Sequence, residues 1–147
     1  MEPTIPILLV EDNRIDIEVV RRALQKANIP NPLYTVLDGV EALEILTGNN
    51  GREKIPQPCL ILLDINMPRM NGFELLEAMC RDDTIRHNVV FMLTTSARNE
   101  DKLTAYSLNA AGYILKENLR PFITLLGEYC RINEWPTIRD RKASLLP

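Results

Sequence analysis

The chain has 147 residues, of which 46% are hydrophobic and 25% charged, and its formal net charge is -3. This length fits one domain with a buried core rather than two independent domains. No apolar run approaches the roughly 20 residues of a membrane helix, no signal peptide is visible, and no basic excess is present to neutralise nucleic-acid phosphates. We therefore expect a cytoplasmic protein that binds neither membranes nor nucleic acid directly.

Short aliphatic runs recur along the chain and predict five strands. They cover residues 7–10, 33–37, 59–63, 89–93 and 112–115. Four of the runs are almost continuously apolar, as expected of strands that are covered on both faces in a parallel sheet. The run at 33–37 is more mixed, and we expect it to lie nearer an edge of the sheet.

Amphipathic segments of helical length lie between and after these runs. They cover residues 12–27, 38–46, 71–80, 98–108 and 118–132, while 48–58 reads as a solvated loop. Strict alternation of strands and helices predicts a three-layer α/β sandwich, because parallel strands need crossover helices and right-handed crossovers cover both faces. In such open sheets, functional residues gather at the carboxyl ends of the strands.

Chemically active residues follow four of the predicted strands. The first strand ends in Glu11-Asp12, the third in Asp64, the fourth in Thr94 and the fifth in Lys116. Clustered carboxylates repel one another unless a cation lies among them, and oxygen ligands without histidine or thiolate fit Mg²⁺. Phosphoryl transfer depends on this kind of positioning and charge neutralisation, so Asp64 is a candidate nucleophile.

Four segments resemble the signature segments of the response-regulator receiver domain of two-component signalling. They are VEDN at 10–13, LLDINMPRMNG at 62–72, LTTS at 93–96 and GYILK at 112–116, in the family's order and spacing. The resemblance implies a flavodoxin-like fold, with a five-stranded parallel sheet and five helices. It assigns a receiver domain to residues 5–132 and leaves 133–147 as a C-terminal tail without a separate effector domain.

The resemblance also implies a metal site and a phosphoacceptor. Asp64 would accept a phosphoryl group from a phosphohistidine on a sensor histidine kinase. Asp12 and Asp64 would coordinate Mg²⁺ directly, Glu11 through water, and Asn66 through its backbone carbonyl.

The remaining matched positions imply phosphate contacts and a switch. Thr94 and Lys116 would contact the phosphoryl oxygens, and Tyr113 matches the aromatic residue that moves inward when the threonine is drawn toward the phosphate. The protein would act as a switch rather than an enzyme, catalysing only its own phosphorylation and dephosphorylation.

The implied partners are other proteins. The donor would be a sensor histidine kinase or a phosphotransfer protein, recognised mainly through Arg14, Ile15 and Val19 on the first helix. The long loop before the third strand and the short end after the last helix resemble single-domain regulators associated with bacterial phytochromes, which points to a phytochrome-type kinase. The output would be a downstream protein target, or a homodimer through the fourth helix, fifth strand and fifth helix.

Glu117 departs from the family pattern, and other interpretations of the site residues stay open. Glu117 stands where proline usually follows the lysine through a cis peptide, so we expect a trans or a strained bond and keep an unphosphorylated interaction module as an alternative. A phosphohydrolase that uses an aspartyl-phosphate would carry an acid at position 66, where this chain has asparagine. Glu11 and Asp12 could cap the first helix, with or without binding metal as well.

Overall fold

The computed structural model describes residues 4–135. Its centre is a five-stranded parallel sheet in the order β2-β1-β3-β4-β5. The strands are β1 (Ile7–Val10), β2 (Leu33–Val36), β3 (Leu60–Leu63), β4 (Val89–Thr94) and β5 (Gly112–Leu115). The expected position of the second strand near an edge is confirmed.

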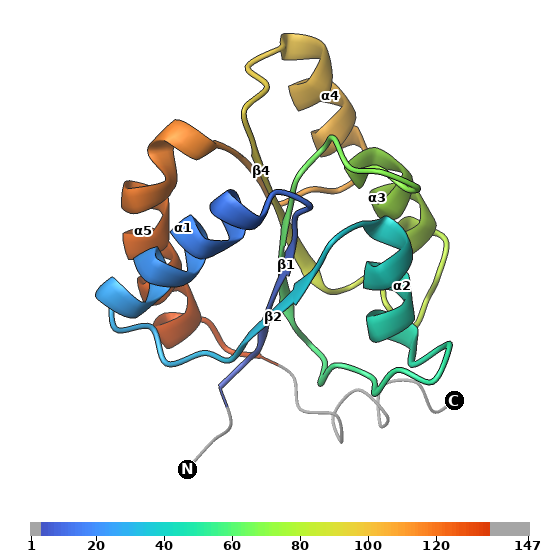
Figure 1. Cartoon of the computed structure of the whole chain (residues 1–147), viewed down its shortest axis with the longest axis horizontal. Helices are drawn as coiled ribbons and strands as arrows, with labels where there is room; N and C mark the ends of the chain where they lie inside the picture. The colour runs from blue at the N-terminus through green and yellow to red at the C-terminus, as the bar shows by residue number, and fades with distance from the viewer. Residues whose placement is uncertain (1–3, 136–147) are drawn as a thin grey trace.

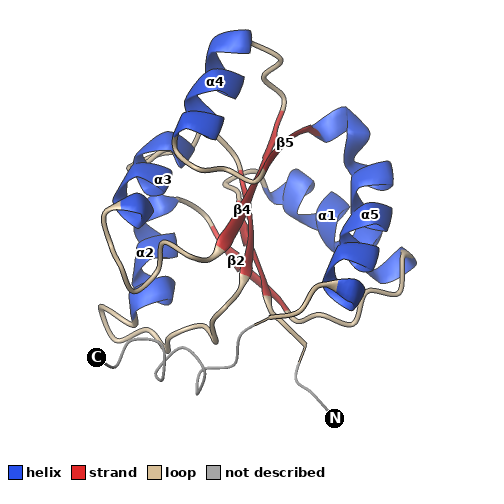
Figure 2. Ribbon diagram, turned by 180° about the vertical axis from the view of Figure 1, so that it is seen from behind, coloured by secondary structure: helices blue, strands red, loops and turns tan. Residues whose placement is uncertain are grey.

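Helices cover both faces of this sheet, as strictly alternating strands and helices require. They are α1 (Arg14–Lys26), α2 (Gly39–Thr47), α3 (Gly72–Cys80), α4 (Asn99–Ser107) and α5 (Leu119–Ile132), with a single 3₁₀ turn, η1 (Lys116–Asn118), before α5. Figures 1 and 2 show α1 and α5 side by side on one face and α2, α3 and α4 on the other. The predicted three-layer, flavodoxin-like sandwich is confirmed.

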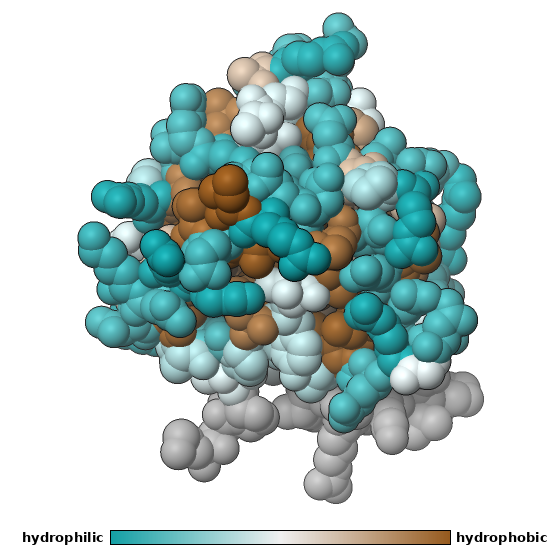
Figure 3. Space-filling model, viewed as in Figure 1, coloured by the Kyte–Doolittle hydropathy of each residue, from teal (hydrophilic) through white to brown (hydrophobic). Residues whose placement is uncertain are grey.

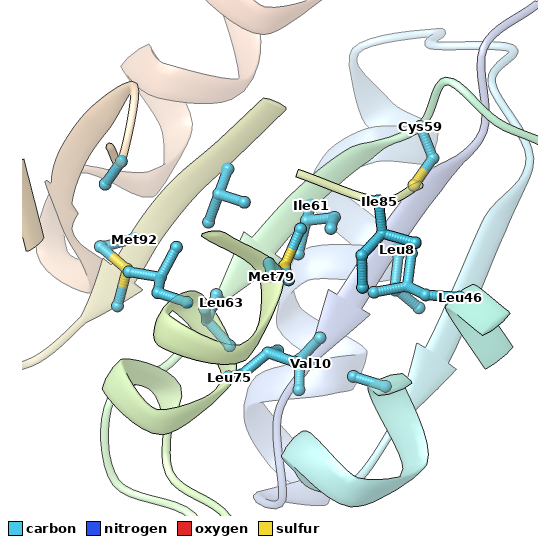
Figure 4. Packing of buried hydrophobic residues seen from close by; sticks show 14 of the residues in the cluster. Leu8, Val10, Leu46, Cys59, Ile61, Leu63, Leu75, Met79, Ile85 and Met92 are labelled. Atoms are coloured by element: carbon cyan, nitrogen blue, oxygen red, sulfur yellow. The ribbon is translucent and has the colours of Figure 1, made fainter. Parts of the chain in front are cut away.

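Strands β1 and β3 are buried on both faces, and the hydrophobic core forms two clusters, one on each face of the sheet. Alternate residues of β1 and β3, such as Leu8 and Ile61, point toward α2 and α3, where they pack with Leu46 and Leu75 (Figure 4). The intervening residues pack against α1 and α5. Each fully buried aliphatic side chain stabilises the fold by about 1.5–3 kcal/mol. The carboxyl ends of β1 and β3 are therefore held rigidly.

The structure corrects the prediction that residues 48–58 form a solvated loop. Ile55 and Gln57 are buried, with 2% and 8% of their surfaces exposed. The Ile55 N–H donates to the carbonyl of Ile45 in α2 (2.9 Å), so the connection folds back against that helix. A single apolar residue in a polar segment has no periodicity that would reveal such burial.

At the C-terminal end, Trp135 packs edge-on against Tyr129 of α5, with ring centroids 5.7 Å apart. Most of the tail predicted at 133–147 lies outside the described residues. Within residues 4–135, no helix is long and apolar enough to cross a membrane.

Candidate metal and phosphoryl site

The register of the central strands brings three acidic residues together. Val10 pairs with Leu63, so Glu11 and Asp64 continue adjacent strands at the same level. Carboxylate oxygens of Glu11, Asp12 and Asp64 lie within 4.8 Å of one another. Glu11 and Asp64 are buried, whereas Asp12 is exposed. The convergence expected of these three residues is confirmed.

The turn after β1 is shaped by Asn13, which caps α1. Its Oδ1 accepts hydrogen bonds from the N–H groups of Ile15 (2.9 Å) and Asp16 (3.1 Å). Its own N–H donates to Oε1 of Glu11 at 3.0 Å. The alternative in which Glu11 or Asp12 caps α1 is therefore wrong, because the helix begins two residues later than predicted and Asn13 satisfies its first N–H groups.

Asp64 is held by its own backbone and by a close glycine. Its Oδ1 accepts the N–H of Ile65 at 2.8 Å. A Cβ at Gly72 would lie 2.2 Å from the carbonyl oxygen of Asp64, so only glycine lets the start of α3 approach so closely. The N–H of Gly72 donates to the carbonyl of Ile65 at 2.8 Å and closes the loop.

Lys116 lies directly after β5 and reaches the acidic cluster. Its Nζ lies 2.8 Å from Oε2 of Glu11, 2.8 Å from Oδ2 of Asp16 and 3.3 Å from Oδ2 of Asp64. An ammonium group has three N–H donors, so these three carboxylates match its full capacity. Asp16 was not among the predicted site residues, because nothing in the sequence marks a contact across 100 positions.

Burial and charge pull the pKa values of this cluster in opposite directions. Burial raises the pKa of Glu11 to about 7, although the hydrogen bond from Lys116 works against the increase. Burial alone would lower the pKa of the Lys116 ammonium, but hydrogen bonds to Asp16 and Glu11 outweigh it, and the pKa rises. Lys116 therefore stays protonated, and its single positive charge faces several carboxylates.

The donor set fits a hard divalent cation. Three carboxylates converge, all the candidate ligand atoms are oxygens, and one lysine cannot neutralise the group. Mg²⁺ prefers oxygen ligands and is commonly bound by one or two carboxylates with several waters, which suits a cluster with one exposed member, Asp12. This cluster is consistent with Mg²⁺.

Thr94 and Tyr113 meet at the backbone of Ser96. Thr94 is fully buried, and its Oγ1 accepts the N–H of Ser96 at 3.3 Å. The Tyr113 hydroxyl donates to the carbonyl of Ser96 at 2.8 Å. The Ser96 hydroxyl in turn donates to Asp101 of α4 at 2.5 Å. The two predicted switch residues are thus connected through one residue of the β4–α4 loop.

The last two positions of interest flank the cluster. Asn66 is exposed in the loop between β3 and α3. Glu117 is exposed in η1, and the Lys116–Glu117 peptide is trans, since the only cis peptide among residues 4–135 is Gln57–Pro58. This resolves the choice between a trans and a strained bond in favour of the trans form.

A separate ion pair lies at the end of β2. Asp38 caps α2 through the N–H of Glu41 (2.9 Å) and accepts hydrogen bonds from Arg69 at 2.8 and 3.2 Å. Burial acts to raise the pKa of Asp38, but the hydrogen bonds from Arg69 and from the Glu41 N–H, together with the charge of Arg69, outweigh it and lower the pKa below its usual range. This pair ties the β3–α3 loop to α2.

The chain is similar to known proteins over most of its length. The family model described as "Response regulator receiver domain" matches residues 7–124. The response regulator Rcp1 of Synechocystis sp. is 33% identical over 121 residues, which is 82% of each chain.

Two solved structures have the same fold. One is the Mn(2+)-bound form of Rcp1, with a TM-score of 0.80 and 29% identity, which covers 92% of this chain and 100% of that one. The other is the phosphorylated cyanobacterial phytochrome response regulator RcpA, with a TM-score of 0.77 and 31% identity over 91% of this chain and 98% of that one.

Proposed function

Because the chain belongs to the family of response regulator receiver domains, it is a phosphoacceptor response regulator of two-component signalling, and we propose that Asp64 takes the phosphoryl group. The observation that carries this proposal is the convergence of Asp64 with Glu11, Asp12 and Lys116 at one edge of the sheet. Asp64 belongs to the acidic cluster, and its Oδ2 also lies 3.3 Å from the Lys116 ammonium.

In the proposed reaction, a carboxylate oxygen of Asp64 attacks the phosphorus of a phosphohistidine. An acyl-phosphate bond forms, the P–N bond breaks, and its electron pair returns to the imidazole, which takes up a proton. Asp12, Asp64, the Asn66 carbonyl and, through water, Glu11 would hold Mg²⁺, which would supply positive charge near the phosphoryl oxygens.

Thr94 and Lys116 are the proposed hydrogen-bond donors to the phosphoryl oxygens. A phosphoryl group adds about -1.5 to -2 charge units and strong acceptors, so it draws both side chains toward Asp64. Any movement of Thr94 changes its bond with Ser96, and Ser96 also holds the Tyr113 hydroxyl. Through that residue, phosphorylation shifts the populations of two arrangements of α4 and β5.

A histidine kinase partner follows from the family, and we propose that it docks on α1. Ile15 and Val19 are 75% and 49% exposed, next to the site. Figure 3 shows hydrophobic surface over this helix. The likeness to RcpA, described as a phytochrome response regulator, supports a phytochrome-type kinase, with a phosphotransfer protein as the other possible donor.

The proposed output surface consists of α4, β5 and α5. Leu103 and Tyr106 of α4 are 65% and 54% exposed, and Leu125 of α5 is 69% exposed. Exposed apolar side chains on α4 and α5, the two helices that flank β5, suit a downstream protein or a second copy of the chain. We propose that residues 5–132 form the receiver domain.

The test is stoichiometric phosphorylation with a small donor. Incubated with Mg²⁺ and phosphoramidate or acetyl phosphate, the protein should gain one phosphoryl group by intact mass, in an acid-stable and base-labile form. Asp64→Asn should abolish the adduct. Asp83→Asn is the matched control, because Asp83 is an exposed carboxylate that precedes β4 at the opposite edge of the sheet.

Two results would favour the alternatives. Steady release of phosphate over many turnovers would indicate a phosphohydrolase. Asn66 argues against that activity, because its exposed side chain is an amide where such an enzyme would carry an acid. Failure to bind both Mg²⁺ and the acyl-phosphate mimic beryllofluoride would indicate an interaction module without phosphorylation.

A further inference from the structure

We propose that Asp16, a residue of helix α1, is a positioning residue that holds the Lys116 ammonium at the site throughout the phosphorylation cycle. This inference rests on the proposed function of Asp64. Its basis is the short contact of 2.8 Å between Asp16 Oδ2 and Lys116 Nζ, which joins the first helix to the end of the last strand.

The three partners of Lys116 are not equivalent. In the proposed cycle, Asp64 becomes an acyl phosphate and Glu11 would help to hold Mg²⁺ through water, so each would exchange the lysine for another partner. Asp16 takes part in neither event. It is therefore the one carboxylate of the three whose contact with Nζ can persist while a phosphoryl oxygen replaces the others.

The backbone of Asp16 is fixed before any ligand arrives. Its N–H donates to Oδ1 of the helix cap Asn13 at 3.1 Å, and the N–H of Asn13 donates to Glu11 at 3.0 Å. Asn13 therefore orients both Glu11, which belongs to the proposed metal site, and Asp16, which contacts Lys116. Since Asp16 lies in the first turn of α1, its charge is also favoured by the helix dipole.

The position of Lys116 explains why an external anchor matters. Its side chain is 18% exposed, and its backbone begins the 3₁₀ turn η1 through a trans peptide to the exposed Glu117. A lysine side chain has a flexible four-carbon stem and no fixed geometry at its ammonium. A carboxylate that accepts a charge-assisted hydrogen bond restricts that freedom and lowers the entropy lost when a phosphoryl oxygen binds.

The experiment compares beryllofluoride binding with Mg²⁺ binding in Asp16→Asn. By calorimetry at saturating Mg²⁺, beryllofluoride affinity should fall about tenfold, which corresponds to about 1.4 kcal/mol. The affinity for Mg²⁺ alone should stay within about twofold of the wild type. The ¹³Cε NMR signal of Lys116 should respond to beryllofluoride less than in the wild type, and Asp16→Glu should recover most of the affinity.

Glu18→Gln is the matched control, because it removes one negative charge from the same helix at a residue that pairs with Arg22 rather than Lys116. Equal beryllofluoride affinity in Asp16→Asn and Glu18→Gln would overturn the inference. So would an equal loss of Mg²⁺ and beryllofluoride affinity, which indicates general disruption. If the wild type binds neither probe, the proposed function itself fails, and the inference falls with it.

Discussion

The two ends of the sheet both bury polar side chains, but in opposite ways. At the amino end, Asn88 accepts from the Cys59 N–H (2.9 Å) and donates to Gln57 (2.9 Å) and to the Ile85 carbonyl (3.1 Å). Gln57 donates in turn to the carbonyl of Leu46 at 2.6 Å. Every group in this network is neutral, and donors and acceptors match.

At the carboxyl end, one lysine faces three carboxylates and a fourth lies beside them. Neither hydrogen bonds nor Lys116 neutralise this charge, so the cluster is costly to bury. This difference in net charge indicates that the neutral network serves the stability of the fold, whereas the acidic cluster serves the binding of a ligand. A matched neutral network stabilises the fold by itself, whereas an excess of one charge becomes favourable only when a cation binds.

The largest effect is expected at the amino end. Asn88→Ala leaves the Cys59 N–H and the Gln57 side-chain oxygen without partners, and should lower the free energy of unfolding by roughly 2–4 kcal/mol. Urea unfolding measures this loss, and beryllofluoride affinity should not change. The exposed Asn99→Ala should have little effect on stability. Reduced beryllofluoride affinity in Asn88→Ala would remove the distinction between the two ends.

A smaller effect of opposite sign is expected for Glu11→Gln. The folded-state pKa of Glu11 is about 7, above the usual 4.5, so the folded protein binds more protons than the unfolded chain between these values. Stability without metal should therefore fall as pH rises through this window. Since one pKa unit corresponds to about 1.4 kcal/mol, Glu11→Gln should stabilise the protein at pH 8 by up to about 3 kcal/mol.

The measurement for Glu11 is urea unfolding at several pH values with EDTA present. The difference between wild type and Glu11→Gln should grow from pH 4.5 to 7 and then level off. Added Mg²⁺ should reverse it by stabilising the wild type more than the variant. A variant that is less stable than the wild type at pH 8 without metal would contradict the view that the acidic cluster reduces stability.

The smallest effect is expected for Asp38→Asn, which tests a matched charge pair at the carboxyl end. Asparagine can still cap α2, so the change removes mainly the attraction to Arg69. The pKa of Asp38 is lowered, so its contribution is present above the usual value of 3.8 and is lost as pH falls through the folded-state value.

Because Arg69 is 56% exposed, the loss at pH 7 should be under about 1 kcal/mol. Acid titration of stability, with the exposed Asp83→Asn as control, measures it. A loss as large as that of Asn88→Ala would mean that ion pairs at this edge stabilise the fold as strongly as the neutral network does.

Much of the fold and the acidic cluster could be predicted because they follow from short-range patterns. Apolar runs predict strands, and residues that follow parallel strands must share one edge, so Glu11, Asp12, Asp64 and Lys116 were expected together. Element boundaries were displaced by a residue or two where a cap decides them, as at Asn13.

Contacts that depend on how whole elements pack could not be predicted. The pairing of Asp16 with Lys116 requires the first turn of α1 to lie against the end of β5, which no local pattern encodes. The burial of Ile55 and Gln57 likewise depends on the path of a loop beneath α2. The role of Ser96 as a link rests on its backbone atoms, which are the same in every residue type except proline.

Because of this property, the contacts of Ser96 differ in how they respond to substitution. The bonds to Thr94 and Tyr113 use its main-chain N–H and carbonyl, whereas the bond to Asp101 uses its hydroxyl. A substitution at position 96 can therefore weaken or strengthen the contact with α4, while the main-chain bonds to Thr94 and Tyr113 are kept. A lineage can retune how strongly its output helix responds without rebuilding the part that senses the phosphoryl group.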